Sequence, residues 1–177
     1  RLIWVGRFEY DKGGDRLLRF LQRLERTSID YEIALLGQQF RNSPEAFTMI
    51  ESGFGHRLVQ YGYVDDTDEY HRWLSAADIV VSTAEHEFQG LAVMEAVISG
   101  CLPLAPDRLV YPELYPQQFL YESSPADPAG EAQAAVARLL ELAHALAAGV
   151  SQPPALSDFR PDAVKARYVS LFQELAG

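Results

Sequence analysis

The sequence is poor in cysteine, in long apolar runs and in positive charge. Its one cysteine, Cys101, excludes an internal disulfide and is typical of a protein from a reducing compartment such as the cytoplasm. Because Cys101 begins an apolar segment, we expect a buried structural thiol rather than a nucleophile. No apolar stretch approaches the roughly 20 residues that a membrane-spanning helix requires, so no membrane span is expected.

Acidic residues outnumber basic ones, 25 against 15, and the formal net charge is −10. Proteins that hold a nucleic-acid backbone do so with Lys and Arg, so this chain is not expected to grip a nucleic acid by itself. The composition of this chain does not exclude a partner domain that binds nucleic acid. The shortage of cations also makes each Lys or Arg near a possible anion site more informative.

Short apolar segments alternate with amphipathic helical segments along the whole chain. This alternation predicts an α/β fold with a Rossmann-like, doubly wound parallel sheet of about six strands. We expect a single domain, residues 1–177, in which residues 158–177 form a terminal helix. The expected strands are 2–5, 31–36, 57–64, 78–82, 101–105 and 119–121, and the expected helices are 15–26, one from 43, 65–76, 90–100, a turn at 110–115, 131–148 and 161–175.

Cap residues mark the starts of the first three helices. Asp15 is expected to be the N-cap of the first helix, and Ser43 that of the second, with Pro44 at the first helical position. The acidic run 65–69 is expected to cap the third helix and to favour its dipole rather than to bind a metal.

The stretch 82–100 is the centre of the expected site. It contains a loop after a buried strand, and then a helix that Gly90 opens and Gly100 closes, the latter with a left-handed cap. The first amides of such a helix have no intrahelical acceptor, so they form an anion site. In a doubly wound sheet the first and fourth strands are neighbours at the switch point. Arg7 and Lys12, which follow the first strand, should therefore face this helix and help to bind a diphosphate.

Glu95 is the unusual residue of this helix, because its neighbours are apolar and predict a buried element. A buried carboxylate needs a partner, and no Lys or Arg occurs between Arg72 and Arg108. Either a distant residue pairs with Glu95 or a ligand donates hydrogen bonds to it. Glu87 lies before the helix, so the two carboxylates should bracket its N-terminus. Such an arrangement suits a phosphate flanked by hydroxyl groups, as in a nucleotide sugar.

Motifs at matching spacing occur together in this chain: Gly6-Arg7 with Lys12-Gly13, Glu87-x7-Glu95-Ala96, and Gly100-x-x-Pro103. Together they resemble the C-terminal half of retaining GT-B glycosyltransferases, over nearly the whole chain. The resemblance implies that Arg7 and Lys12 hold the diphosphate of the donor. It further implies that Glu87 and the backbone after Gly90 hold the transferred sugar, and that Glu95 binds the ribose hydroxyls.

The candidate catalytic residues are therefore Glu87, Arg7 and Lys12. The candidate donor-binding residues are Arg7, Lys12, Val64, His86, Glu87, Gly90, Leu91, Ala92 and Glu95, and no metal ligand is expected. Val64 is included because its backbone is expected to lie at the edge of the base pocket. His86 equally fits a solvated loop histidine, the segment 111–113 equally fits the cap of a short helix, and Glu85 is expected to be structural or exposed.

Segments 8–12, 80–88 and 109–113 resemble, more narrowly, the tRNA-queuosine mannosyltransferase family. This resemblance implies GDP-mannose as the donor and queuosine in the anticodon of a tRNA as the acceptor. Gly6 and Gln89 depart from the pattern of that family, which expects Asn-His before the arginine and an aromatic residue before the glycine. These departures bear on the acceptor more than on the donor.

The resemblance implies the donor-binding domain of a metal-independent hexosyltransferase. Because the chain begins directly in an expected strand, we expect an absent N-terminal acceptor domain, through which tRNA is bound, and no turnover by the chain alone. Three alternatives stay open: a glycosyltransferase with another nucleotide sugar and a non-tRNA acceptor, a non-catalytic nucleotide-sugar binding module, and an epimerase of a nucleotide sugar.

Overall fold

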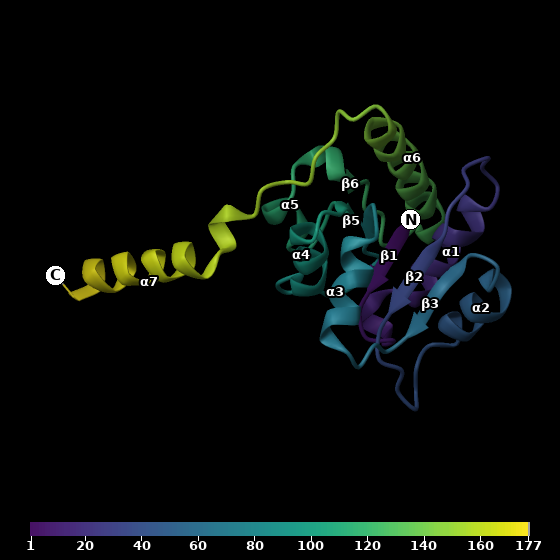
Figure 1. Ribbon diagram of the computed structural model, residues 1–177, viewed down its shortest axis with the longest axis horizontal. Helices are drawn as coiled ribbons and strands as arrows, with labels where there is room; N and C mark the ends of the chain where they lie inside the picture. The colour runs from purple at the N-terminus through teal and green to yellow at the C-terminus, as the bar shows by residue number, and fades with distance from the viewer. Residues whose placement is uncertain (177) are drawn as a thin grey trace.

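Six short strands form one parallel sheet in the order β3-β2-β1-β4-β5-β6 (Figure 1). The computed structural model describes residues 1–176; residue 177, the last of the expected terminal segment, lies outside the described residues. The strands are β1 Leu2–Val5, β2 Ile33–Leu36, β3 Leu58–Gly62, β4 Ile79–Val81, β5 Leu102–Pro106 and β6 Leu120–Tyr121. This is the expected doubly wound α/β sheet, and the pairing of β1 with β4 at the switch point is confirmed.

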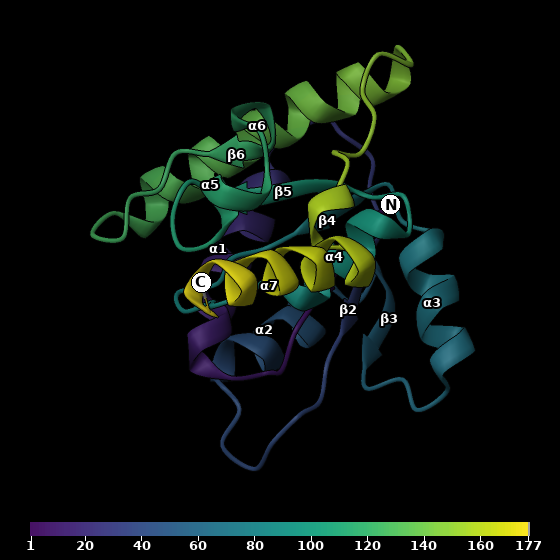
Figure 2. The same ribbon diagram turned by 90° about the vertical axis from the view of Figure 1, so that its left-hand side faces the viewer.

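The helices are α1 Gly14–Leu24, α2 Glu45–Phe54, α3 Thr67–Ser75, α4 Leu91–Ile98, α5 Tyr111–Leu114, α6 Pro128–Ala147 and α7 Pro161–Ala176, with single 3₁₀ turns η1 Tyr10–Lys12, η2 Gln117–Phe119 and η3 Ser157–Phe159. Helices α1, α2 and α6 cover one face of the sheet, and α3 and α4 cover the other (Figure 1). Helix α7 stands away from this body, and Figure 2 shows it from the side on which it projects.

Two expected N-caps are wrong. Gly13, with φ of 70°, precedes α1, and Asp15 lies inside the helix. Pro44 takes the N-cap position of α2, because the Ser43 hydroxyl bonds to the backbone of Phe40 instead. In both places a local turn decides where the helix begins, whatever the capping preference of the nearby side chain.

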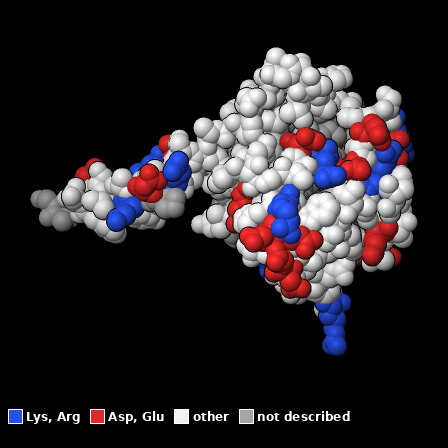
Figure 3. All heavy atoms as spheres, in the orientation of Figure 1, with Lys and Arg blue, Asp and Glu red and all other residues white. Residues whose placement is uncertain are grey.

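Other expected helix ends are confirmed. Asp66 caps α3 by accepting the amide of Glu69 at 2.7 Å. Gly100, with φ of 115°, follows α4, and its amide bonds to the carbonyl of Val97 while the next amide bonds to that of Ala96. The acidic side chains at the start of α3 gather on one face of the molecule (Figure 3).

The core places the loop after β1 beside the loop after β4. Phe8 is fully buried and stacks on Phe47 of α2 at 4.3 Å between ring centroids, which anchors the first loop. At Gly13, a Cβ atom would lie 1.9 Å from the carbonyl oxygen of Thr83, so only glycine allows the two loops to approach so closely. Cys101 is buried as expected, and burial raises the pKa of its thiol to about 12.

Candidate functional site

A cleft of about 400 Å³ opens between the β1 loop and the loop before α4. Its walls include Lys12 from the first loop and Glu87 from the second, and its floor is the first turn of α4. The two loops meet because β1 and β4 are paired neighbours whose carboxyl ends lie at the same edge of the sheet. The residues lining the cleft are Val5, Gly6, Arg7, Asp11, Lys12, His86, Glu87, Phe88, Gln89, Leu91 and Ala92.

Lys12 is the cation at the centre of this cleft. Its Nζ atom lies 3.0 Å from Oε2 of Glu87, 3.4 Å from the carbonyl oxygen of His86 and 3.5 Å from Oδ2 of Asp11. The side chain is 17% exposed, so these charges interact more strongly than an ion pair in open solvent. The ammonium group is thus already neutralised by Glu87, a partner 75 positions away in the sequence.

Glu87 occupies the entrance to α4. Its Oε1 atom accepts the amide of Gly90 at 3.1 Å and that of Phe88 at 3.1 Å, while its other oxygen accepts Lys12. Burial by itself raises the pKa of Glu87, but the hydrogen bonds from Lys12 and Gly90 and the charge of Lys12 outweigh it, so the pKa lies below 4.5. The carboxylate is therefore ionised at neutral pH.

The first turn of α4 retains donors for an anion. The amide of Met94 makes the first helical bond, to the carbonyl of Gly90. Within the part of the chain that the structure describes, no acceptor bonds to the amides of Leu91, Ala92 and Val93. These groups and the dipole of the helix favour a phosphate group at this end.

Arg7 also lines the cleft, but its side chain is 57% exposed. Its guanidinium pairs with Glu9 at 2.9 Å and lies 4.0 Å from Asp11. Such an exposed pair contributes little to stability, so Arg7 is free to change partners when an anion enters. The structure therefore brings both predicted cations to the cleft, with Lys12 the more enclosed of the two.

A second hollow, of about 230 Å³, continues from the first and shares Val5, Gly6 and Arg7 with it. Val64, a candidate donor-binding residue, lies in its wall. The sequence interpretation did not predict five further lining residues, Leu36, Gly37, Gln38, Tyr63 and Tyr70. The signal was available for Gly37 and Gln38, since they follow the second strand at the same edge of the sheet.

Glu95 is not buried, which corrects the expectation from its apolar neighbours. Helix α4 buries Val93, Met94, Ala96 and Val97 but leaves its outer face open, where Ile98 is 73% exposed. The carboxylate accepts the hydroxyl of Tyr70 at 2.9 Å. Burial and Glu95 raise the pKa of that hydroxyl, so it stays protonated and donates. Tyr70 thus links Glu95 to the second hollow, whose wall it forms.

The remaining candidates divide between the cleft and the core. His86, Leu91 and Ala92 line the cleft, whereas Gly90 is buried and is not one of its lining residues. Tyr111 is fully buried and its hydroxyl lies 2.6 Å from that of Ser82, so it supports the loop from behind. Pro112 and Glu113 are exposed, and the segment 111–113 is part of the short helix α5. Glu85 is exposed and paired with Arg16, as expected of a structural residue.

No group of three or more His, Cys, Asp or Glu side chains within residues 1–176 is arranged to hold a metal ion. None of the helices described for this chain is long and apolar enough to cross a membrane.

Acid is expected to weaken the contacts of Glu87. Because the pKa of Glu87 is lower in the folded chain than its ordinary 4.5, the unfolded chain binds more protons near that pH. The stabilisation is present above pH 4.5 and is lost as the pH falls through the lower folded value.

We expect the melting temperature of the chain to fall more steeply between about pH 5 and pH 3 than that of Glu87→Gln, as measured by circular dichroism. Glu25, whose pKa is lowered by Tyr31, titrates equally in both proteins; parallel pH profiles would contradict the prediction.

The chain is similar in sequence to known proteins. The family described as glycosyl transferases group 1 matches residues 1–142. The tRNA-queuosine alpha-mannosyltransferase of Drosophila melanogaster is 42% identical over 125 residues, which are 71% of this chain and 33% of that protein. The chain therefore spans about a third of the length of this relative.

Solved structures share the fold at lower identity. The pneumococcal O-GlcNAc transferase GtfA, solved with UDP and GlcNAc, superposes with a TM-score of 0.66 at 19% identity, over 81% of this chain and 28% of that one. The C-terminal domain of a group 1 glycosyl transferase from Francisella tularensis superposes with a TM-score of 0.58 at 20% identity, over 79% of this chain and 84% of that one. The fold is that of one half of a GT-B glycosyltransferase.

Proposed function

Because the chain belongs to the group 1 glycosyl transferases, in which it forms a donor-binding domain, we propose that the full-length protein transfers mannose from GDP-mannose to queuosine in a tRNA. The observation that carries the donor half of this proposal is the convergence of Lys12, Arg7 and the open amides of α4 on one cleft. The likeness to the Drosophila enzyme supports the mannose and the tRNA acceptor.

In this proposal the leaving group is the nucleoside diphosphate. Lys12, Arg7 and the amides of Leu91 and Ala92 stabilise the negative charge that develops on it as the bond to the sugar breaks. Glu87 stands beside the diphosphate site, where a carboxylate favours the positive charge that a glycosyl transition state carries on the ring. In the same proposal Glu95 and Tyr70 contact the ribose, and the second hollow takes the base.

The chain is proposed to act together with an N-terminal domain that carries the acceptor site. Large exposed apolar side chains support a surface that another domain covers. Phe88 and Leu91 at the cleft are 92% and 58% exposed, Ile98 at the far end of α4 is 73% exposed, and Phe172 on α7 is 63% exposed. We propose that tRNA is held mainly by that domain, since this chain has a net charge of −10. The same proposal places the reaction in the cytoplasm and requires no metal ion.

The test uses the full-length protein with GDP-mannose labelled in the sugar. We expect label on tRNA that contains queuosine, none on the same tRNA with guanosine at that position, and the same rate in the presence of EDTA. UDP-glucose is the control donor. The isolated chain should bind GDP weakly and transfer nothing.

Transfer to another acceptor or from another donor would retain the glycosyltransferase and reject the substrates proposed. Isomerisation or hydrolysis of the donor without an acceptor would instead indicate an epimerase. Binding without any turnover by the full-length protein would indicate a module that has lost catalysis.

A further inference from the structure

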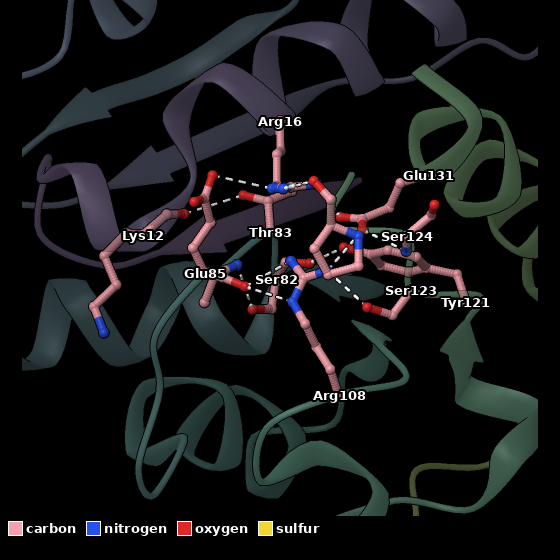
Figure 4. Close-up of polar contacts among 12 residues, drawn as sticks. Lys12, Arg16, Ser82, Thr83, Glu85, Arg108, Tyr121, Ser123, Ser124 and Glu131 are labelled. Carbon is pink, nitrogen blue, oxygen red and sulfur yellow. Dashed lines mark hydrogen bonds and ion pairs between the residues drawn. The ribbon is translucent and has the colours of Figure 1, made fainter. Parts of the chain in front are cut away.

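A buried cluster of charges lies behind the loop that carries Glu87 (Figure 4). Its centre is Glu131 in the first turn of α6, which is 3% exposed. One carboxylate oxygen accepts Arg108 at 2.6 Å and the amide of Ser124 at 2.9 Å. The other lies 2.9 Å from Nη1 of Arg16, as an ion pair in which neither atom makes a hydrogen bond within the described residues.

Both arginines of this cluster reach on to the loop before α4. Arg108 donates through Nη2 and Nε to the carbonyl oxygen of Ala84, at 2.8 and 3.3 Å. Arg16 donates through Nε to Oε1 of Glu85 at 3.0 Å. The cluster therefore contains two cations and two carboxylates, and its charges balance only when Glu85 is in place.

The same loop is held on its other side by the segment that carries Lys12. The amides of Glu85 and His86 both donate to the carbonyl oxygen of Asp11, at 2.8 and 3.0 Å. The hydroxyl of Thr83 donates to the carbonyl oxygen of Lys12 at 3.2 Å. These contacts fix the loop before α4 between the buried cluster and the loop after β1.

We propose that Arg16, Arg108 and Glu131 are positioning residues that hold the segment 84–87 so that Glu87 meets Lys12 and the amide of Gly90. The effect on catalysis rests on the proposed function, whereas the effect on the loop does not. The desolvation of buried charges often costs as much free energy as their attraction contributes, so such a cluster need not stabilise the fold. Its direct contacts to Ala84 and Glu85 instead indicate that it positions the loop.

Arg108→Lys tests the two-pronged contact, because lysine keeps the charge but cannot donate in parallel to one carbonyl oxygen. Arg138→Lys is the matched control: Arg138 also holds a backbone carbonyl, that of Leu120, and a carboxylate, that of Glu141, but it does so away from the cleft. Glu85→Gln is the second variant, since Glu85 is 46% exposed and its replacement leaves the buried part of the cluster intact.

The readout is hydrogen exchange of the amides of Glu85 and His86 in the isolated chain, together with the NMR shift of the Gly90 amide. Arg108→Lys should speed exchange at both amides by about tenfold or more and move the Gly90 signal. Glu85→Gln should change them in the same direction to a smaller extent, and Arg138→Lys should leave them unchanged even where it lowers the melting temperature.

Kinetics of the full-length protein form the second arm. Arg108→Lys should lower kcat while GDP affinity stays within about twofold, because GDP binding depends mainly on Lys12 and the α4 amides. A fall in melting temperature without a change at Glu85, His86 and Gly90 would overturn the proposal and leave the cluster structural. If the amides respond but the parent protein transfers no sugar, positioning stands and the proposed function fails.

Discussion

Replacing Glu87 with glutamine is expected to lower kcat of the full-length protein by about 100- to 1,000-fold. The amide retains an oxygen that can accept the amide of Gly90, so the start of α4 is kept. The negative charge beside the proposed sugar site is lost, and with it the proposed stabilisation of a transition state that is positive at the ring. GDP affinity should not fall, because Lys12 loses its anionic partner and becomes more available to phosphate.

Steady-state kinetics with donor and acceptor, together with calorimetry with GDP, would measure both effects. Glu32→Gln is the control, because Glu32 is exposed and directly precedes β2, at the amino ends of the strands and so at the edge of the sheet opposite the cleft. A kcat within about threefold of the parent protein would contradict the role proposed for Glu87, since an electrostatic group in the site should cost far more.

Replacing Lys12 with alanine is expected to raise the dissociation constant for GDP by about 10- to 150-fold. The expectation corresponds to ~1.5–3 kcal/mol, the range for a hydrogen bond to a charged group. The substitution also leaves Glu87 as an unpaired anion at the proposed diphosphate site, which adds repulsion to the lost attraction. Arg7→Ala should have a smaller effect, since Arg7 is 57% exposed.

Calorimetric titrations of GDP, UDP and ADP into the chain would measure these changes and rank the bases. Lys165→Ala, on the exposed surface of α7, is the matched control. The double variant Lys12→Ala/Glu87→Gln should recover part of the lost affinity, because the two side chains are in contact and their effects are not additive. Unchanged affinities for both GDP and UDP in Lys12→Ala would reject the assigned contact.

Much of the site could be expected from local features. Arg7 and Lys12 reach the cleft because they follow a strand whose neighbour in the sheet is β4, and α4 starts directly after its N-cap Gly90, as expected. Each of these expectations depended on short-range periodicity and on the rules of parallel sheets, which act whatever the other side chains are.

Glu95 shows where such local evidence ended. Its apolar neighbours predicted a buried helix, but the described part of the chain buries only the side of α4 that carries Val93, Met94, Ala96 and Val97. The pattern of apolar residues along a helix indicates which of its faces favour burial, but other segments of the fold must pack on those faces to bury them. The partner of Glu95 is Tyr70, a residue of α3 whose side chain carried no sign of this role.

The sequence alone determined the sheet, the cleft and the helix at its floor. It did so through the alternation of apolar runs, the positions of glycine and the spacing of the two glutamates. The choice of partner for each charge depended on how the folded layers pack: Lys12 meets Glu87 across 75 positions, and Arg108 meets Glu131 across 23. A local pattern cannot encode such pairs, because every carboxylate of the chain is an equal candidate until packing brings one of them within about 3 Å.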